Sequence, residues 1–410
     1  MTDFQDNARA AAAEMHKVFP PTPLQRNAFL SELYATEIYL KREDLSPVRS
    51  YKNRGAFNAM GKAIAKGANR FVCASAGNHA QGVALACHHY GVKGRIYMPV
   101  TTPQQKIEKT AVFGRTNIEI ILEGDYFDET LAAAQAYAAS DNAVMLAPFD
   151  DADVIQGQAS VGIEIEVQLN GVPDLLICPV GGGGLSSGLK SYFGPTLDLR
   201  LVEPNGGRSL HAALENGALV TLPHVDNFVD GAAVARIGEA NWAVLKDQPI
   251  EKVYGVEEDR LCATITQLLN IEGIVLEPAG ALSIDLLKDL SDDIRGKRVV
   301  CIVSGGNFDF ERLPDVKERA LRYSGLKKYY ILRMPQRPGA LREFLNLLGP
   351  NDDIARFEYL KKSARNFGSV LLGIESTTAE GFPALEEKII SRGFSFQDIT
   401  NDEILAQFLI

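Results

Sequence analysis

The stretch "C-P-V-G-G-G-G-L-S-S-G" at residues 178–188 decides the fold. It follows the apolar run "D-L-L-I", which is typical of a buried strand, and it leads into a stretch with helical character. Consecutive glycines let the backbone approach an anion closely, and a helix N-terminus adds oriented N–H groups. The stretch is neither a nucleotide P-loop nor a clean dinucleotide fingerprint. We therefore predict a phosphate cradle at the end of a strand, the alternative being a tight turn without a ligand.

Short apolar strands alternate with helical stretches on both sides of this loop. Examples are "R-F-V-C-A-S" at residues 70–75, "G-R-I-Y-M-P" at 94–99 and "K-R-V-V-C-I-V-S-G-G-N" at 297–307. Their β-branched composition and the helices between them indicate parallel strands that are covered on both faces. The expected class is α/β, over about residues 1–311.

The pattern changes after residues 312–325, a charged and helical stretch that we interpret as a connector. Beyond it, "L-K-K-Y-Y-I-L-R-M" predicts a strand, and "P-G-A-L-R-E-F-L-N-L-L-G" predicts a helix with Pro near its start and Gly at its end. The remaining runs continue a β-α-β-β-α-β order. Residues 326–410 should therefore form a small ferredoxin-like α+β domain.

Bulk composition restricts the class of protein. The 410 residues are 46% hydrophobic and 23% charged, with a net charge of −10. This acidic balance argues against a nucleic-acid or anionic-membrane partner. The five cysteines lack disulfide or zinc spacing, the N-terminus lacks a signal peptide, and no apolar run reaches membrane-spanning length. We expect a cytoplasmic protein without a metal site.

Three further motifs carry candidate chemistry. "S-A-G-N-H-A-Q-G" at residues 75–82 lies between a strand and a helix and offers donors to an anion such as a carboxylate. In it, His79 is either a general base or, as we favour, a structural residue at a helix start. "V-S-G-G-N" ends a strand, where Ser304 is either a ligand contact or a helix cap. Lys52, in "S-Y-K-N-R-G", is either a solvated charge or a nucleophile; a nearby phosphate cradle favours a lysine that binds a phosphorylated aldehyde.

Together with "K-R-E-D-L-S-P-V-R-S-Y-K-N-R-G", these motifs resemble the serine/threonine dehydratase family of pyridoxal-phosphate enzymes, which have the tryptophan-synthase-β fold. The resemblance covers about residues 21–312. It implies fold type II, with two open twisted parallel-sheet subdomains, the smaller at about residues 50–150. Residues 326–410 resemble the ACT-like regulatory domain of biosynthetic threonine dehydratases, in their short form with one such domain.

The resemblance also implies roles for single residues. Lys52 matches the lysine that forms the Schiff base with pyridoxal 5′-phosphate, Asn78 the contact to the cofactor 3′ oxygen, and Ser304 the partner of the pyridine nitrogen. The phosphate loop corresponds to Gly181, Gly182, Gly183, Gly184 and Leu185. Expected substrate contacts are Ser75, Gly77, Asn78, His79 and Gly231, with Glu277 as a further wall of the site.

The implied reaction is dehydration and deamination of L-threonine to 2-oxobutanoate and ammonia, with L-serine as a further substrate. Ala76 supports elimination, because racemase relatives carry a serine there as a second acid/base. Racemase relatives also bind a metal after a strand resembling "V-E-P-N-G-G-R-S-L". Glu203 is present in this stretch, but Ser209 stands where a second acid would be expected, so no metal is predicted.

For the C-terminal domain the resemblance implies amino-acid sensing, with isoleucine as inhibitor and valine as its antagonist. The segment "M-P-Q-R-P-G-A-L-R-E-F" resembles the ligand-binding loop of such domains, which makes Arg337, Gly339 and Leu341 candidate effector contacts. The alternative is a packing or oligomerisation domain without an effector. The family also implies a homotetramer.

Three other interpretations remain open. A catabolic serine/threonine dehydratase would usually lack the C-terminal domain. A NAD-dependent oxidoreductase would leave Lys52 without a role, and a non-catalytic sensor would not need intact catalytic motifs. The sequence does not determine the threonine-to-serine preference, the number of subunits, a cation requirement or the strength of effector responses.

Overall fold

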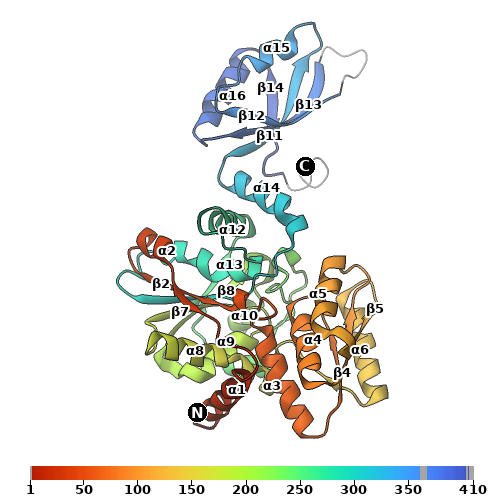
Figure 1. Cartoon of the computed structure of the whole chain (residues 1–410). Helices are drawn as coiled ribbons and strands as arrows, with labels where there is room; N and C mark the ends of the chain where they lie inside the picture. The colour runs from red at the N-terminus through yellow and green to blue at the C-terminus, as the bar shows by residue number, and fades with distance from the viewer. Residues whose placement is uncertain (1, 361–366, 403–404, 406–410) are drawn as a thin grey trace. The chain divides into compact units, whose positions relative to one another are not determined.

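The computed structural model describes residues 2–360, 367–402 and 405. Contacts within the chain divide it into two compact units, Met1–Asp309 and Phe310–Ile410. Each unit is described by itself, and Figure 1 shows the elements of both. Among the described residues, no helix combines the length and the apolar composition needed to cross a membrane.

The first unit is built around a six-stranded sheet with the order β1-β2-β10-β7-β8-β9. All neighbours in this sheet are parallel except β1 and β2. Its strands are β1 (Leu24–Arg26), β2 (Glu37–Arg42), β7 (Leu175–Pro179), β8 (Asp198–Pro204), β9 (Val253–Val256) and β10 (Arg298–Val303). The central strands β7 and β10 are almost wholly buried, as expected for β-branched strands that are covered on both faces.

A second sheet in the same unit has four parallel strands in the order β5-β4-β3-β6. These strands are β3 (Arg70–Ala74), β4 (Lys93–Met98), β5 (Ile118–Leu122) and β6 (Val144–Met145). The expected α/β class is confirmed, with one sheet that is parallel except at β1 and one that is wholly parallel.

Helices connect the strands and cover both sheets (Figure 1). The α-helices of the first unit are α1 (Thr2–Met15), α2 (Ala28–Leu33), α3 (Lys52–Ala65), α4 (Asn78–Tyr90), α5 (Gln104–Gly114), α6 (Phe127–Asp141), α7 (Ala152–Gln158), α8 (Ser160–Leu169), α9 (Gly184–Phe193), α10 (Ser209–Asn216), α11 (Glu239–Leu245), α12 (Glu258–Glu272) and α13 (Pro278–Asp285). Two of them pack very closely: a Cβ at Gly82 of α4 would lie 3.1 Å from the backbone of Asn53 in α3. The motif "S-A-G-N-H-A-Q-G" therefore fixes its own helix against the helix that begins at Lys52.

The second unit begins with α14 (Leu313–Tyr323) and continues as an antiparallel sheet with the order β12-β13-β11-β14. Its elements are β11 (Lys327–Pro335), α15 (Ala340–Leu345), β12 (Asp352–Leu360), β13 (Phe367–Ser376), α16 (Gly381–Ser391) and β14 (Ser395–Asp398). Tyr330, Phe344 and Phe382 contribute to a core between the sheet and its helices. This β-α-β-β-α-β order is the predicted ferredoxin-like fold.

A buried ion network holds the first turn of α3 from behind. The guanidinium of Arg54 donates to Glu43 at 2.8 and 2.9 Å and to Glu164 at 2.6 and 2.8 Å. The ammonium of Lys41 lies 2.6 Å from Glu164. Side-chain exposure is no more than 1% in each of these residues. Two cations thus balance two carboxylates in a region that water does not reach.

Loss of one partner from this network should destabilise the first unit strongly. Arg54→Met leaves two buried carboxylates with Lys41 as the one fully buried cation beside them and the partly exposed His16 at Glu164, so the free energy of unfolding should fall by about 3–5 kcal/mol. Arg95→Met, which removes a partly exposed pair with Glu119, should cost less than about 1 kcal/mol. Urea unfolding followed by the fluorescence of Trp242, the single tryptophan, reports on this unit. Similar small losses in both variants would contradict the buried network.

Candidate active site

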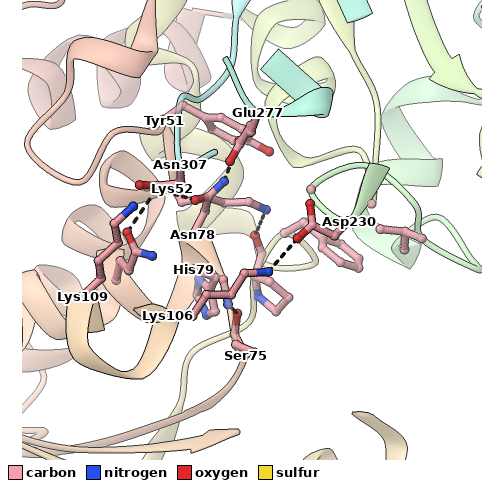
Figure 2. Close-up of a pocket in the computed structure, with 18 of the residues that line it drawn as sticks. Tyr51, Lys52, Ser75, Asn78, His79, Lys106, Lys109, Asp230, Glu277 and Asn307 are labelled. Atoms are coloured by element: carbon pink, nitrogen blue, oxygen red, sulfur yellow. Dashed lines mark hydrogen bonds and ion pairs between the residues drawn. The ribbon is translucent and has the colours of Figure 1, made fainter. Parts of the chain in front are cut away.

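A cavity of about 300 Å³ lies in the first unit and is lined by loops from both sheets. Figure 2 shows 18 of the residues that line it and labels ten of them. The sequence-predicted residues that line this cavity are Lys52, Ser75, Gly77, Asn78, His79, Gly182 and Gly231. The fold therefore brings together the lysine, part of the glycine loop and the proposed substrate loop.

Lys52 is the first residue of α3, and its ammonium lies inside the cavity (Figure 2). Nζ donates to the carbonyl oxygen of Pro148 at 3.0 Å and lies 5.2 Å and 5.9 Å from the ring centroids of Tyr51 and Phe149. Among the residues that the structure describes, no carboxylate forms an ion pair with it. Burial lowers the pKa of Lys52 from 10.5 to about 8, although the nearby Glu277 raises it somewhat. The result is an amine with an unusually large neutral fraction near physiological pH.

The glycine loop joins the end of β7 to the start of α9. Gly183 adopts φ +96°, and a Cβ at Gly182 would lie 2.3 Å from the ring of Phe149, so both positions require glycine. In the described part of the chain, no group accepts a hydrogen bond from the backbone N–H groups of residues 181–186. Unpartnered N–H groups at a helix N-terminus are suited to bind a phosphate. The loop thus fits the phosphate of pyridoxal phosphate, and the Lys52 amine fits its aldehyde.

The loop at residues 75–82 places α4 with its N-terminus at the cavity. The backbone N–H of Gly77 donates to Ser75 Oγ at 3.2 Å. His79 is 4% exposed, and its Nε2 lies 2.9 Å from the carbonyl oxygen of Leu146. Burial, followed by the charge of Lys52, lowers the pKa of His79 to about 4. This neutral, tethered imidazole favours the structural interpretation of His79 over the general-base one.

The other predicted residues do not line the cavity directly. Ser304 follows β10 and is 4% exposed, and its carbonyl oxygen accepts a hydrogen bond from the backbone of Tyr51. Gly181, Gly183, Gly184 and Leu185 form the rest of the turn around Gly182 and the start of α9. These positions stay predictions as cofactor contacts.

The regulatory candidates lie in the second unit. Arg337 is an exposed residue whose guanidinium pairs with Glu343 at 2.6 Å. Gly339 has φ +85° and precedes α15, and Leu341 is 42% exposed on that helix. They surround the turn between β11 and α15.

Several lining residues were not predicted from sequence. Lys106 of α5 forms an ion pair with Asp230 at 2.8 Å, and Asn307 closes the cavity beside Asn78 (Figure 2). Glu277 was only a tentative wall residue, yet its carboxylate accepts a hydrogen bond from Asn78 at 2.8 Å. Burial and, next, the charge of Asp230 raise the pKa of Glu277 to about 7. Asn307 ends the "V-S-G-G-N" motif, and Asp230 begins "D-G-A-A-V", the stretch that supplied Gly231 as a wall of the site, so both had a usable signal; Lys106 had none.

Two positions bear on the predicted reaction. Ala76 lines the cavity and offers no acid or base. Glu203 is fully buried, and its two carboxylate oxygens accept the backbone N–H groups of Leu210 and His211 at 2.7 and 3.0 Å. Glu203 therefore caps the N-terminal turns of α10, which gives it a structural role.

Comparisons with known proteins match both units. Residues 17–305 match the family described as pyridoxal-phosphate dependent enzyme, and residues 318–409 match the C-terminal regulatory domain of threonine dehydratase. The biosynthetic L-threonine dehydratase IlvA of Bacillus subtilis is 45% identical over 394 residues, which are 95% of this chain and 93% of the relative. The protein of the same name from Halalkalibacterium halodurans is 43% identical and covers 95% of both chains.

The fold of this chain also resembles a solved structure. The processed form of threonine deaminase isoform 2 from Solanum lycopersicum superimposes with a TM-score of 0.73 and 35% sequence identity. The match covers 78% of this chain and 88% of that one.

The lowered pKa of Lys52 can be measured in the apoprotein. Because the pKa is lowered, the neutral amine should appear at lower pH than in an ordinary lysine, with half of the molecules deprotonated near pH 8. Brief acylation across a pH series, followed by peptide mass spectrometry, should give a midpoint near 8 at Lys52. A midpoint near 10 would show that the site does not desolvate this amine.

Proposed function

The chain belongs to the family of pyridoxal-phosphate-dependent enzymes, and we propose that it is a biosynthetic threonine dehydratase whose C-terminal domain responds to isoleucine. The enzyme converts L-threonine to 2-oxobutanoate and ammonia. The elements of water leave threonine and are taken up again when the enamine product hydrolyses, so the net change is loss of ammonia.

The cofactor is pyridoxal 5′-phosphate, which when bound supplies an electron sink for the charge that develops at Cα. Lys52 and the N–H groups of residues 181–186 are the groups that would hold it. The Lys52 amine, with its pKa near 8, is suited to accept and hold the Cα proton. The rings of Tyr51 and Phe149 lie beside that amine.

The observation that carries this proposal is the placement of Lys52. A desolvated amine, which no carboxylate of the described residues pairs with, faces the same cavity as Gly182 of the glycine loop. A solvated surface lysine would have neither the aromatic neighbours nor the lowered pKa. Ser75, Gly77 and Asn78 line the cavity from α4 and its preceding loop, where the helix N-terminus is suited to the substrate carboxylate.

Ser304 is the proposed partner of the cofactor ring nitrogen. A neutral hydroxyl does not enforce a protonated ring as a carboxylate would, so it favours elimination over transamination. Ala76 removes the second acid/base that racemisation requires. Both positions support a dehydratase.

A catabolic serine/threonine dehydratase is the second candidate, since L-serine differs from threonine by one methyl group. The match of residues 318–409 to a regulatory domain argues for the biosynthetic enzyme. We assign residues 1–311 to catalysis, 312–325 to a connector and 326–410 to regulation.

Regulation and assembly extend the proposal. Isoleucine as inhibitor and valine as its antagonist are the proposed effectors, with Arg337, Gly339 and Leu341 as candidate contacts. Arg337 is exposed and could exchange its partner Glu343 for the carboxylate of an amino acid. A cytoplasmic homotetramer is the proposed working form.

Turnover of L-threonine tests both domains. The release of 2-oxo acid should require pyridoxal phosphate, fall on addition of isoleucine and recover on addition of valine. Arg337→Ala should weaken the isoleucine response at least fivefold without changing basal turnover. Arg356→Ala, which removes another exposed pair of the same domain, should leave the response unchanged.

Each result has a distinct meaning. Turnover that ignores isoleucine would keep the catalytic assignment and reduce the C-terminal domain to a structural role. Turnover of serine alone would favour the catabolic alternative. A protein that binds the cofactor but turns over neither amino acid would contradict the proposed reaction.

A further inference from the structure

The side chain of Asn78 is held by partners at both ends of its amide (Figure 2). Its Nδ2 donates to Glu277 Oε1 at 2.8 Å, and its Oδ1 accepts from Asn307 Nδ2 at 2.6 Å. The three residues come from α4, from the start of α13 and from the segment after β10, and all three line the cavity.

The orientation of this amide follows from its neighbours. An amide can be turned over with little change in shape, so only its partners decide where O and N lie. At one end, Asn307 Nδ2 also donates to the carbonyl oxygen of Val48 at 2.8 Å and to Gln81 Oε1 at 3.1 Å. A backbone carbonyl accepts and never donates, so it fixes nitrogen on that side of Asn307, which in turn presents a donor to Asn78.

The other end leads to the same orientation. Glu277 is 6% exposed, and the oxygen that faces Asn78 can accept a hydrogen bond whether or not the carboxyl group is ionised. The buried Oδ1 of Asn307 has no partner among the described residues, whereas three oxygens converge on its Nδ2. Position 307 therefore needs a donor, and position 277 needs an acceptor.

These constraints leave one hydrogen on Asn78 Nδ2 without a partner among the residues that the structure describes. Asn78 lines the cavity, so this N–H is available to a ligand there. If the amide were turned over, the same place would present a lone pair of Oδ1. A phenolic oxygen that carries negative charge is attracted by the first arrangement and repelled by the second.

We propose that Glu277 and Asn307 are positioning residues, which lock the Asn78 amide so that it presents N–H to the 3′ oxygen of the cofactor. This inference rests on the proposed function, because it needs pyridoxal phosphate in the cavity. In this role Glu277 and Asn307 determine whether Asn78 presents a donor or an acceptor to the cavity, rather than the shape of the cavity.

The test exchanges donor for acceptor at position 307, so that Asn78 is favoured with its amide turned over. In Asn307→Asp the carboxylate cannot donate, so it favours the turned-over Asn78 while Glu277 favours the original. Affinity for pyridoxal phosphate, measured by titration of apoprotein, should fall at least tenfold, and the visible absorbance band of the bound cofactor should shift. Glu277→Gln alone should change cofactor affinity and absorbance little, because the amide oxygen of the glutamine can still accept a hydrogen bond from Asn78.

The double variant Glu277→Gln/Asn307→Asp separates positioning from stability. Its glutamine can donate to a turned-over Asn78, so the melting temperature should recover from that of Asn307→Asp. Cofactor affinity should nevertheless stay low and the absorbance band stay shifted, because Asn78 is then locked with oxygen toward the cavity. Recovery of affinity and absorbance together with stability would overturn the proposal and leave a structural role.

A matched control and a second variant complete the experiment. Asn58→Asp also removes an amide-to-carbonyl bond, to Asp153, but outside the cavity, and should leave absorbance and affinity unchanged. If Asn307→Asp does not fold, Glu277→Leu removes one of the two groups that hold the Asn78 amide, so cofactor affinity should fall, although less than a reversed amide would lower it; unchanged affinity and an unshifted absorbance band would overturn the proposal. A wild-type protein without a cofactor band would instead contradict the proposed function itself.

Discussion

The rest of the site depends on the buried network that holds Arg54. Lys52 can lose its hydration only if the protein fixes the helix that carries it, because a mobile first turn would let the ammonium return to water. Arg54 lies two residues further along α3 and binds Glu43, which follows β2, and Glu164 of α8. The charges behind the helix compensate one another, whereas the amine in front of it forms no ion pair with a carboxylate in the described part of the chain. This difference between the paired charges and the unpaired amine, together with burial, lowers the pKa of Lys52.

The two parallel sheets supply the remaining geometry. Strands β3 and β7 both end at loops that line the cavity, and these loops lead into the N-termini of α4 and α9. One loop is suited to a phosphate and the other to a carboxylate, so the cofactor and the substrate can be bound by backbone in a chain with a net charge of −10. Side chains then set the polarity between these two anion sites, and Asn78 lies at the point where they meet.

Local motifs predicted much of this site, because they encode local physics. The glycine loop, the start of α4 and Lys52 can each be recognised from a motif of a few residues. The order of strands and helices along the sequence predicted the fold class of both units. Contacts between distant segments were missed. Asn307 and Asn78 are 229 residues apart and Lys106 and Asp230 are 124 apart, so no pattern in the sequence joins them. Glu277 was recognised only as a wall, because its hydrogen bond to Asn78 depends on how α13 packs.

We propose that Lys52 carries the cofactor, and borohydride reduction of the protein with bound pyridoxal phosphate, followed by peptide mass spectrometry, is the decisive experiment. We expect one stable pyridoxyl group, located at Lys52, and none at Lys106 or Lys109, which line the same cavity. A label on either of those lysines, or a protein that binds pyridoxal phosphate but retains no label, would contradict it.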